Sequence, residues 1–401
     1  MSRPLGAFKL VVVGSPRYFA EHGTPQVPAD LLRHACLLYK FPSTGRLQVW
    51  PVNGQGQSEL NLPATLVCNT TEALLYVVRD ALGIACVPDF TVRDAIVAGE
   101  LVTVLAAVNP SKDKPNPSAR LDVVELASRK VIATCDLGGQ PDSVAISPDK
   151  TFAAIASENE RDEELNDGEI PPLPSGNLKI ISLKDGAPDC ATAKTVELTG
   201  LSEIAPEDAE PEFVSINREN QIAVTLQENN HIAIIDAASG KITNHFSAGT
   251  VDLDKIDVEK DGALKFDGSA KGVLREPDTI KWLDNNRVIV ANEGDYKGGS
   301  RSFTIFTKDG KVAYESGASL EHKIAEAGHY PDKRNKKGVE LEGAEVGKFG
   351  DTNYLFVASE RASIVGVYKD TGAEPEFVQL LPSGIAPEGV LAIPSRNLLV
   401  T

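Results

Sequence analysis

The chain has 401 residues, 42% of them hydrophobic, and a formal net charge of −17. This length allows two or three domains, the lack of any run of 18 apolar residues predicts no membrane span, and the acidic balance disfavours nucleic acid as a partner and favours cations. The whole charge deficit belongs to residues 108–401, because residues 1–107 contain eight basic and eight acidic side chains. Solubility is the alternative explanation of this charge.

Residues 1–105 alternate strand-like and helix-like segments, which predicts a layered α/β structure. One amphipathic helix, at 70–83, has Thr70 or Thr71 as its N-cap and Gly83 after its last turn. The expected strands are 8–13, 35–40, 47–52, 64–69, 84–90 and 101–105, and the other helices are 16–23, 28–34 and 91–99. Residues 106–120 are expected to form a linker or the edge of a blade in the next domain.

Five cysteines are spread over the chain without a C-x-x-C pair. An odd number does not describe a disulfide scaffold, so we expect free buried thiols, with a Cys135–Cys190 bridge as the alternative. The N-terminal run VVV (11–13) has the length of a strand, and no small-residue cleavage site follows it. This pattern is not that of a signal peptide, which as written agrees with a cytoplasmic protein, but the sequence leaves the compartment open.

A pair of acidic residues recurs four times in the second half of the chain, with one acid near the start of an apolar run and the other just after the next run. The separations within the pairs are 16, 16, 15 and 18 residues. The pairs are Asp142 and Glu158, Glu212 and Glu228, Asp278 and Glu293, and Glu342 and Glu360, and a fifth copy begins at Glu388. Self-similarity at this period predicts a repeat architecture.

Each copy predicts a strand, a turn and a second strand, as in FVSI–NREN–QIAVTL (213–226). A second hairpin with an Asp-Gly, Ser-Gly or Thr-Gly turn follows, and two hairpins make one four-stranded blade. Residues 121–401 therefore predict a mainly β, incomplete β-propeller. Its four whole blades start near Pro141, Pro211, Pro277 and Leu341. Half-blades at 121–137 and 387–401 are expected to pair with each other and close a smaller, five-bladed ring.

Both acids of a copy lie at the same end of their hairpin, and in a propeller this end surrounds the central channel. A ring of nine carboxylates is therefore expected: Asp142, Glu158, Glu212, Glu228, Asp278, Glu293, Glu342, Glu360 and Glu388. Like charges this close need compensation, and a divalent cation, best Ca²⁺ or else Mg²⁺, would supply it and polarise a phosphate ester. The alternative is structural, with acids that cap backbone N–H groups and fix the spacing of the blades.

A second candidate metal site is the segment Asp257-x-Glu259-x-Asp261-Gly262, which matches the spacing of the first ligands of a calcium loop. Position 12 of that loop is glycine, so Asp267 would replace the missing bidentate ligand. An ordinary acidic surface loop with an Asp-Gly turn is the alternative.

Histidine and arginine side chains are further candidates to hold a phosphate. The set is His231, His322, His329, Arg161, Arg275, Arg301 and Arg361. Arg275 and Arg361 adjoin acids of the ring, and ion pairs with those acids are the favoured alternative. His231 is expected to be a hydrogen-bonded strand residue.

The first part of the chain resembles the effector-binding domain of LysR-type transcriptional regulators. The matching stretches are 11–39, STGRLQVW (43–50) and 69–105. This resemblance implies part of a periplasmic-binding-protein-like α/β fold, and small-molecule sensing with Thr70 and Thr71 at the effector. Helix capping is the favoured alternative for these threonines. The family's DNA-binding helix-turn-helix has no counterpart in this sequence, so DNA binding is not expected.

Residues 107–401 resemble the choice-of-anchor I domain, a secreted bacterial β-propeller. The stretches that carry the resemblance include DLGGQPDSVAISPD (136–149), VTLQENNHIAIID (224–236), REPDTIKW (275–282) and FVASERASIVGVY (356–368). Relatives are often described as alkaline phosphatases or phytase-like esterases, which implies phosphoester hydrolysis. The whole chain therefore looks like a fusion of two fragments, and a non-enzymatic cell-surface interaction propeller is the alternative function.

Overall fold

A computed structural model describes most of the chain from residue 10 onwards. The segments it leaves undescribed are 1–9, 16–17, 20–21, 23–24, 26–27, 42–44, 51–61, 81, 89–102, 109–117, 126–129, 160–169, 171–173, 185, 260, 295 and 332–336. The chain forms two compact units, the first from 1–102 with 125–130 and the second from 103–124 with 131–401. No described helix is long and apolar enough to cross a membrane.

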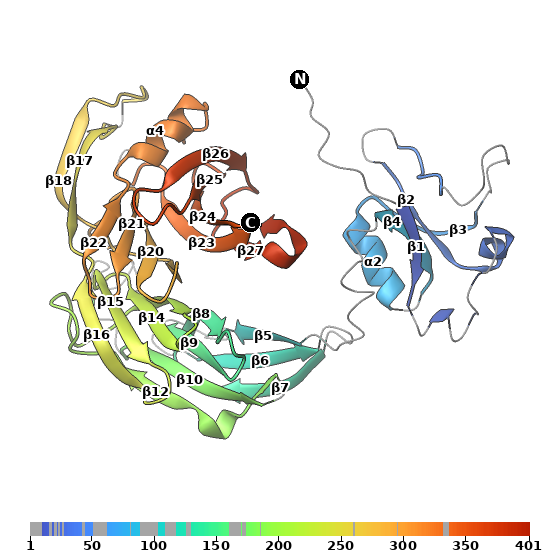
Figure 1. Cartoon of the computed structure of the whole chain (residues 1–401), viewed down its shortest axis with the longest axis horizontal. Helices are drawn as coiled ribbons and strands as arrows, with labels where there is room; N and C mark the ends of the chain where they lie inside the picture. Colours follow the sequence, from blue (N-terminus) through green and yellow to red (C-terminus); the bar gives the residue numbers. More distant parts are fainter. Residues whose placement is uncertain are drawn as a thin grey trace. The chain divides into compact units, whose positions relative to one another are not determined.

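The first unit is built on a four-stranded sheet in the order β1-β4-β2-β3 (Figure 1). The strands are β1 (Leu10–Gly14), β2 (Cys36–Tyr39), β3 (Ala64–Cys68) and β4 (Ile84–Pro88). β2 runs parallel to both β3 and β4, while β1 is antiparallel to β4. The sheet is therefore mixed.

Both faces of this sheet are covered by apolar side chains. Leu74 and Val78 of helix α2 (Thr71–Arg79) pack with Leu37 on one face. Alternation along β2 turns Cys36 to the other face, where it packs with Leu31 of the 3₁₀ helix η1 (Pro28–Arg33).

Three expectations for the first unit differ from the structure. The predicted strand at 47–52 is represented, in its described residues 47–50, by an isolated bridge between Leu47 and Lys40. The helix expected at 70–83 ends at Arg79. The strand expected at 101–105 is β5 (Thr103–Val108), which joins the second unit. The predicted helix 91–99 and most of the predicted linker lie outside the described residues.

The second unit contains four successive sheets with four main strands each (Figure 1). The first comprises β8 (Gln140–Ile146), β9 (Phe152–Glu158), β10 (Asn177–Lys184) and β12 (Lys194–Glu197), with β11 (Ala187–Pro188) also on β10. The second comprises β13 (Pro211–Ile216), β14 (Gln221–Leu226), β15 (His231–Asp236) and β16 (Lys241–Ser247). The third comprises β19 (Ile280–Trp282), β20 (Arg287–Asn292), β21 (Ser302–Thr307) and β22 (Val312–Glu315). The fourth comprises β23 (Leu341–Phe349), β24 (Thr352–Ser359), β25 (Ile364–Lys369) and β26 (Glu376–Pro382).

The sheets bury both faces against one another. Every residue of β9 is buried, whereas β16 alternates exposed and half-buried residues. An inner strand is therefore enclosed along its whole length, and an outer strand is solvated on one face. Leu178 of the first sheet packs with Val224 of the second, and Ile234 of the second packs with Val290 of the third. The first strands also touch in sequence, β8 on β13, β13 on β19 and β19 on β23.

Hydrogen bonds tie each sheet to the next. Ser143 Oγ accepts from Val214 N at 2.8 Å, and one sheet further on Ser215 Oγ accepts from Trp282 N at 3.2 Å. In the turn after β13, Asn220 donates to Asp149 in the turn after β8 at 2.7 Å. These bonds hold the C-terminal parts of neighbouring inner strands together.

The predicted closure of the ring by its two half-blades is wrong. Strands β6 (Arg120–Glu125) and β7 (Lys130–Asp136) form a three-stranded sheet in which β5 is the third strand. Strands β27 (Leu391–Ile393) and β28 (Leu398–Val400), joined by η5 (Pro394–Arg396), form a separate sheet, and β27 contacts β23. Because β5 and β7 occupy both edges of β6, this strand has no edge left for another partner.

Two insertions complete the second unit, and neither was expected. Strands β17 (Thr250–Ile256) and β18 (Gly268–Leu274) form a two-stranded sheet of their own, and helix α4 (Ser319–Glu326) follows β22. Leu320 of α4 is fully buried in the core shared by the third and fourth sheets. This core compensates for a helix that is too short to be stable alone.

The expectation of free thiols is wrong for one pair of cysteines. Cys135 of β7 and Cys190 of η4 (Cys190–Thr192) form a disulfide, with Cα atoms 5.4 Å apart. The two cysteines meet because the sheet of β5, β6 and β7 packs on the first four-stranded sheet. They are 55 residues apart in the sequence, so this contact could not be seen in the local sequence pattern. The three free cysteines are Cys36, Cys68 and Cys86, all in the first unit.

Candidate metal centre

The first acid of three repeats lies in a β-bulge. The register between β8 and β9 shifts between Pro141 and Ser143, which brackets Asp142. The register also shifts across Glu212 in the second sheet and across Glu342 in the fourth. Bulges release a side chain from the regular alternation of a strand and re-aim it. Asp278 instead lies just before β19, and its N–H donates to Ala291 O at 3.0 Å.

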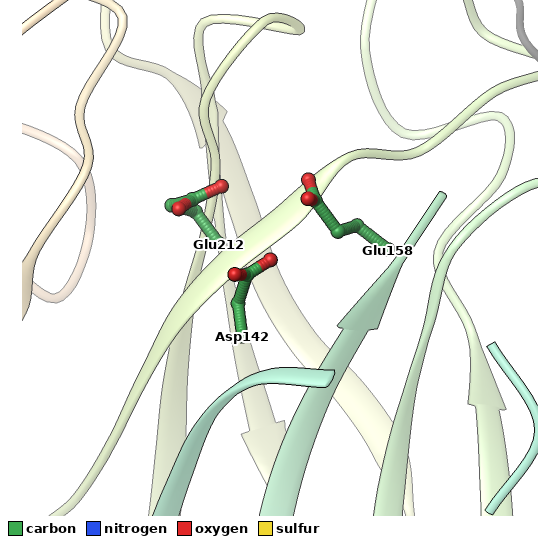
Figure 2. Close-up of side chains that lie close together, drawn as sticks. All are labelled: Asp142, Glu158 and Glu212. Atoms are coloured by element: carbon green, nitrogen blue, oxygen red, sulfur yellow. The ribbon is translucent and has the colours of Figure 1, made fainter. Parts of the chain in front are cut away.

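Three carboxylates converge at the first and second sheets, and we call Asp142, Glu158 and Glu212 the central site. One oxygen of each lies within 4.8 Å of the others, and theirs is the only such group of three or more metal-binding side chains in the described part of the chain. Figure 2 shows the three carboxylates turned towards a common space. Glu158 is buried, Glu212 half-buried and Asp142 exposed, so the site opens on the Asp142 side.

Burial and mutual repulsion raise the pKa values of two of the three acids in the central site. Burial, followed by the charges of Glu212 and Asp142, raises the pKa of Glu158 well above its usual value. Burial, followed by Asp142 and Asp278, raises the pKa of Glu212 in the same way. No lysine or arginine among the described residues forms an ion pair with Glu158 or Glu212. Protons or a cation must therefore balance the charge.

The opposite part of the ring has cationic partners. Lys337 donates to Glu293 at 3.1 Å, and Gln227 donates to the other oxygen of Glu293 at 2.8 Å. Arg361 lies 2.7 Å from Glu360. The ring is therefore uneven, with compensating side chains at the third and fourth sheets.

Burial and neighbouring acids also raise the pKa values of acids outside the central site. Burial, then the charges of Glu293 and Glu342, raises the pKa of Asp278 well above its usual value. Burial, then Glu293 and Glu360, raises the pKa of Glu342 to about 8. Glu388 is exposed and adds to the repulsion on Glu342, while Glu228 is buried and adds to that on Glu158.

The candidate arginines have different partners in the structure. Arg361 pairs with the ring acid Glu360, as expected. Arg275 does not pair with a ring acid, and the expectation is wrong there, because its guanidinium reaches outwards to Glu315 on β22 at 2.9 Å. Arg301 is 2% exposed and pairs with Glu321 of α4 at 3.0 Å. Arg161 lies outside the described residues.

The candidate histidines are dispersed. His231 Nε2 lies 3.0 Å from His245 Nδ1, and burial and that neighbour lower the pKa of His231 to about 4. His322 Nε2 lies 2.7 Å from Lys255 O. His329 is exposed after α4. None of the three belongs to the central site.

The predicted calcium loop is not gathered around one point in this conformation. Asp257 is buried and accepts from Glu259 N at 3.2 Å, while Asp261 accepts from Ala263 N at 2.9 Å and from Lys265. Glu259 and Asp267 are exposed. These contacts are those of local turns, and calcium binding at this loop stays a prediction.

Thr70 has a structural contact. It is the N-cap of α2, with extended backbone, and its Oγ1 accepts from Ala73 N at 3.3 Å. Thr71 is the first residue of the helix. Effector binding by these two residues stays a prediction.

Several acids near the ring escaped the sequence analysis. Glu210, Glu276 and Glu340 each stand two residues before a ring acid, and all three are buried. Glu276 accepts from the backbone N–H groups of Tyr296 and Lys297 at 2.8 and 2.7 Å, so it holds the loop after β20. The recurrence of Glu-x-acid in three copies was a signal that could have found them.

Comparison with known proteins finds similarity for both parts of the chain. The choice-of-anchor I domain model matches residues 46–298 and 296–373. The regulator CrgA of Neisseria meningitidis serogroup C is 34% identical over 104 residues, which are 26% of this chain and 34% of that protein. The Escherichia coli regulator YhjC is 34% identical over 110 residues, 26% of this chain and 36% of that protein. The chain thus spans about a third of the length of the curated relatives it matches.

Solved structures show more distant similarity. A functionally unknown protein from Desulfotomaculum acetoxidans has a TM-score of 0.42 and 9% identity, over 70% of this chain and 68% of that one. The regulatory domain of CrgA, a LysR-type regulator, has a TM-score of 0.22 and 26% identity, over 33% of this chain and 54% of that one. The curated regulators show that the first part of the chain is similar to LysR-type regulators. The choice-of-anchor I model matches most of the whole chain, and the chain belongs to that family.

Proposed function

We propose that the second unit binds a divalent cation, Ca²⁺ or Mg²⁺, at the central site. The observation that carries the proposal is the convergence of Asp142, Glu158 and Glu212 within 4.8 Å without a described cationic partner for the latter two. Hard oxygen ligands suit these ions, and a cation would remove the repulsion that otherwise requires protonation.

We also propose that the ligand of the loaded site is a phosphate ester or another anion. A bound cation would supply a positive charge that holds the phosphate and polarises its phosphorus–oxygen bonds. Phosphoester hydrolysis is the reaction that this arrangement favours.

The test compares melting temperatures of the full chain in EDTA and in millimolar Ca²⁺. Wild type and the exposed control Glu374→Gln are expected to gain several degrees with Ca²⁺, because an ion bound only by the native state stabilises it. Glu158→Gln is expected to lose part of this gain. Equal gains in Glu158→Gln and wild type would overturn the central site. Phosphatase assays with Ca²⁺ or Mg²⁺ on the same three proteins then test hydrolysis.

A non-enzymatic interaction surface is the competing function. Ion pairs already neutralise Glu293 and Glu360, which favours a structural role for that part of the ring. Cation binding without phosphatase activity in the three proteins would support this alternative.

The fold proposals follow from the same contacts. We propose that the second unit is a β-propeller with four complete blades, supported by the stacking of its sheets and the contacts among β8, β13, β19 and β23. For the first unit we propose part of a periplasmic-binding-protein-like, effector-binding α/β domain, supported by its mixed sheet and its similarity to regulators. A small-molecule effector is the ligand that this similarity suggests.

A further inference from the structure

Two more carboxyl groups lie outside the central site, in the segment between β12 and β13. Asp208 and Glu210 are both 0% exposed, and we call them the buried acid pair. Carboxylates are almost never fully buried unless they are paired. A pair of them with no access to water therefore needs a specific explanation.

The hydrogen-bonding capacity of the buried acid pair is largely unfilled in the described chain. None of the four carboxylate oxygens of Asp208 and Glu210 has a hydrogen-bond partner of normal geometry in the described chain. The two groups act on each other, and the Asn159 backbone N–H acts on Glu210 without reaching that geometry. An ionised carboxylate in such surroundings loses its hydration without replacement.

Electrostatics oppose ionisation of both groups. Both carboxyl groups are 0% exposed, so an ionised form of either would lose its hydration, and the charge of Glu228 acts against a charge on Glu210. Glu228 also acts on Glu158, so the pair is close to the central site but distinct from it. Protons or a cation must be present in the native state.

The surrounding backbone is held firmly in place. Asn229, 2% exposed, donates to Asp208 O at 2.7 Å and accepts from Glu210 N at 2.9 Å. Between these two residues, Ala209 N donates to Ser175 Oγ at 2.8 Å. The carboxyl groups therefore project from a fixed backbone, which is what a preorganised ion site requires.

We propose that Asp208 and Glu210 form a second, buried site for one divalent cation of the calcium class. One such ion neutralises two carboxylates, and four orphaned oxygens are the hard ligands it prefers. Mg²⁺ retains several waters, and the near-zero exposure of these oxygens leaves no place for them. A cavity of about 410 Å³ is lined by Ala205, Pro206 and Glu207, directly before Asp208.

The test counts Ca²⁺ ions per chain by mass spectrometry of metals after gel filtration. Wild type and the control Glu203→Gln, an exposed acid on the same segment, are expected to retain two ions. The double variant Asp208→Asn/Glu210→Gln and the central-site variant Glu158→Gln are each expected to retain one. The amides keep the volume of the acids, and should the double variant not fold, Asp208→Asn alone gives the same comparison.

The outcomes separate this site from the central one. An unchanged ion count in the double variant overturns the second site and indicates a protonated acid pair. Wild type could instead retain one ion, which Glu158→Gln keeps and the double variant loses. This result would support the second site and overturn the central site. No ion in any protein overturns both.

Discussion

The central site depends on the direction of single side chains. Asp142, Glu212 and Glu342 occupy bulges, where the extra residue leaves the regular alternation of the strand. This brings acids of different sheets together, and burial together with the neighbouring charges raises the pKa values of Glu212 and Glu342. Stability and ion binding are therefore coupled at these residues.

The pH dependence of stability tests this coupling at Glu342. Its pKa rises from 4.5 to about 8 in the folded state. The native state therefore binds more protons than the unfolded state in this window, and stability falls as pH rises through it. In EDTA, the urea midpoint of wild type is expected to fall between pH 4.5 and 8, and Glu342→Gln to reduce this fall.

The remaining slope in Glu342→Gln is expected to keep its sign, because Glu158 and Asp278 have pKa values raised in the same direction. The exposed control Glu374→Gln is expected to follow wild type. A wild-type midpoint that rises across the window would contradict the repulsion described for the ring.

At the scale of elements, the disulfide joins two sheets. Cys190 is exposed and its partner Cys135 is buried in β7. A bridge that closes a loop of 55 residues is worth about 4 kcal/mol by the loop-entropy relation. Cys190→Ser is expected to lower the free energy of unfolding by up to about this amount, measured by urea titration.

A reductant provides the control for this variant. It is expected to lower the stability of wild type to that of Cys190→Ser and to leave the variant unchanged. Equal midpoints for oxidised wild type and Cys190→Ser would mean that the bridge does not stabilise the fold.

Helix α4 is anchored by a buried ion pair. Glu321 is 0% exposed, accepts from Tyr330 Oη at 2.6 Å and pairs with Arg301. Glu321→Gln removes the negative charge that faces the buried guanidinium of Arg301 and is expected to cost about 3 kcal/mol in urea unfolding. Glu326→Gln, which removes an exposed pair with Lys323 on the same helix, is expected to cost less than about 1 kcal/mol.

Comparable losses in Glu321→Gln and Glu326→Gln would contradict the anchoring role. The short helix was not expected from sequence because its apolar residues are few. Its position depends on Leu320, which packs into a core assembled from two sheets.

At the scale of the whole molecule, the two units differ in their cysteine chemistry. The first unit has three free thiols and the second has a disulfide. Disulfides persist in oxidising compartments, whereas cytosolic proteins keep their thiols reduced. The contrast is consistent with a fusion of two parts that are similar to a regulator and to a choice-of-anchor I protein.

Thiol titration tests this division. Burial raises the pKa values of Cys36 and Cys86 to about 11, so both are expected to react slowly in the native protein. Half-buried Cys68 is expected to react first, three thiols to react after denaturation, and all five after reduction. Five thiols in the unreduced, denatured protein would show that Cys135 and Cys190 are not bonded.

The sequence by itself determined the repeat, the order of strand pairs and the acids of the ring. Alternating apolar residues and turn residues are local signals, and they carry this information without any knowledge of distant contacts. The family resemblance was also present in contiguous stretches such as 275–282.

Only the tertiary structure decided which residues meet across the repeat. Packing of one sheet on another brought Cys135 to Cys190, turned Arg275 away from the ring and enclosed Asp208 with Glu210. Pairing of β5 with β6 excluded the expected closure by the terminal hairpins. These outcomes depend on which surfaces are buried together, and burial between segments far apart in sequence leaves no periodic signal in the chain.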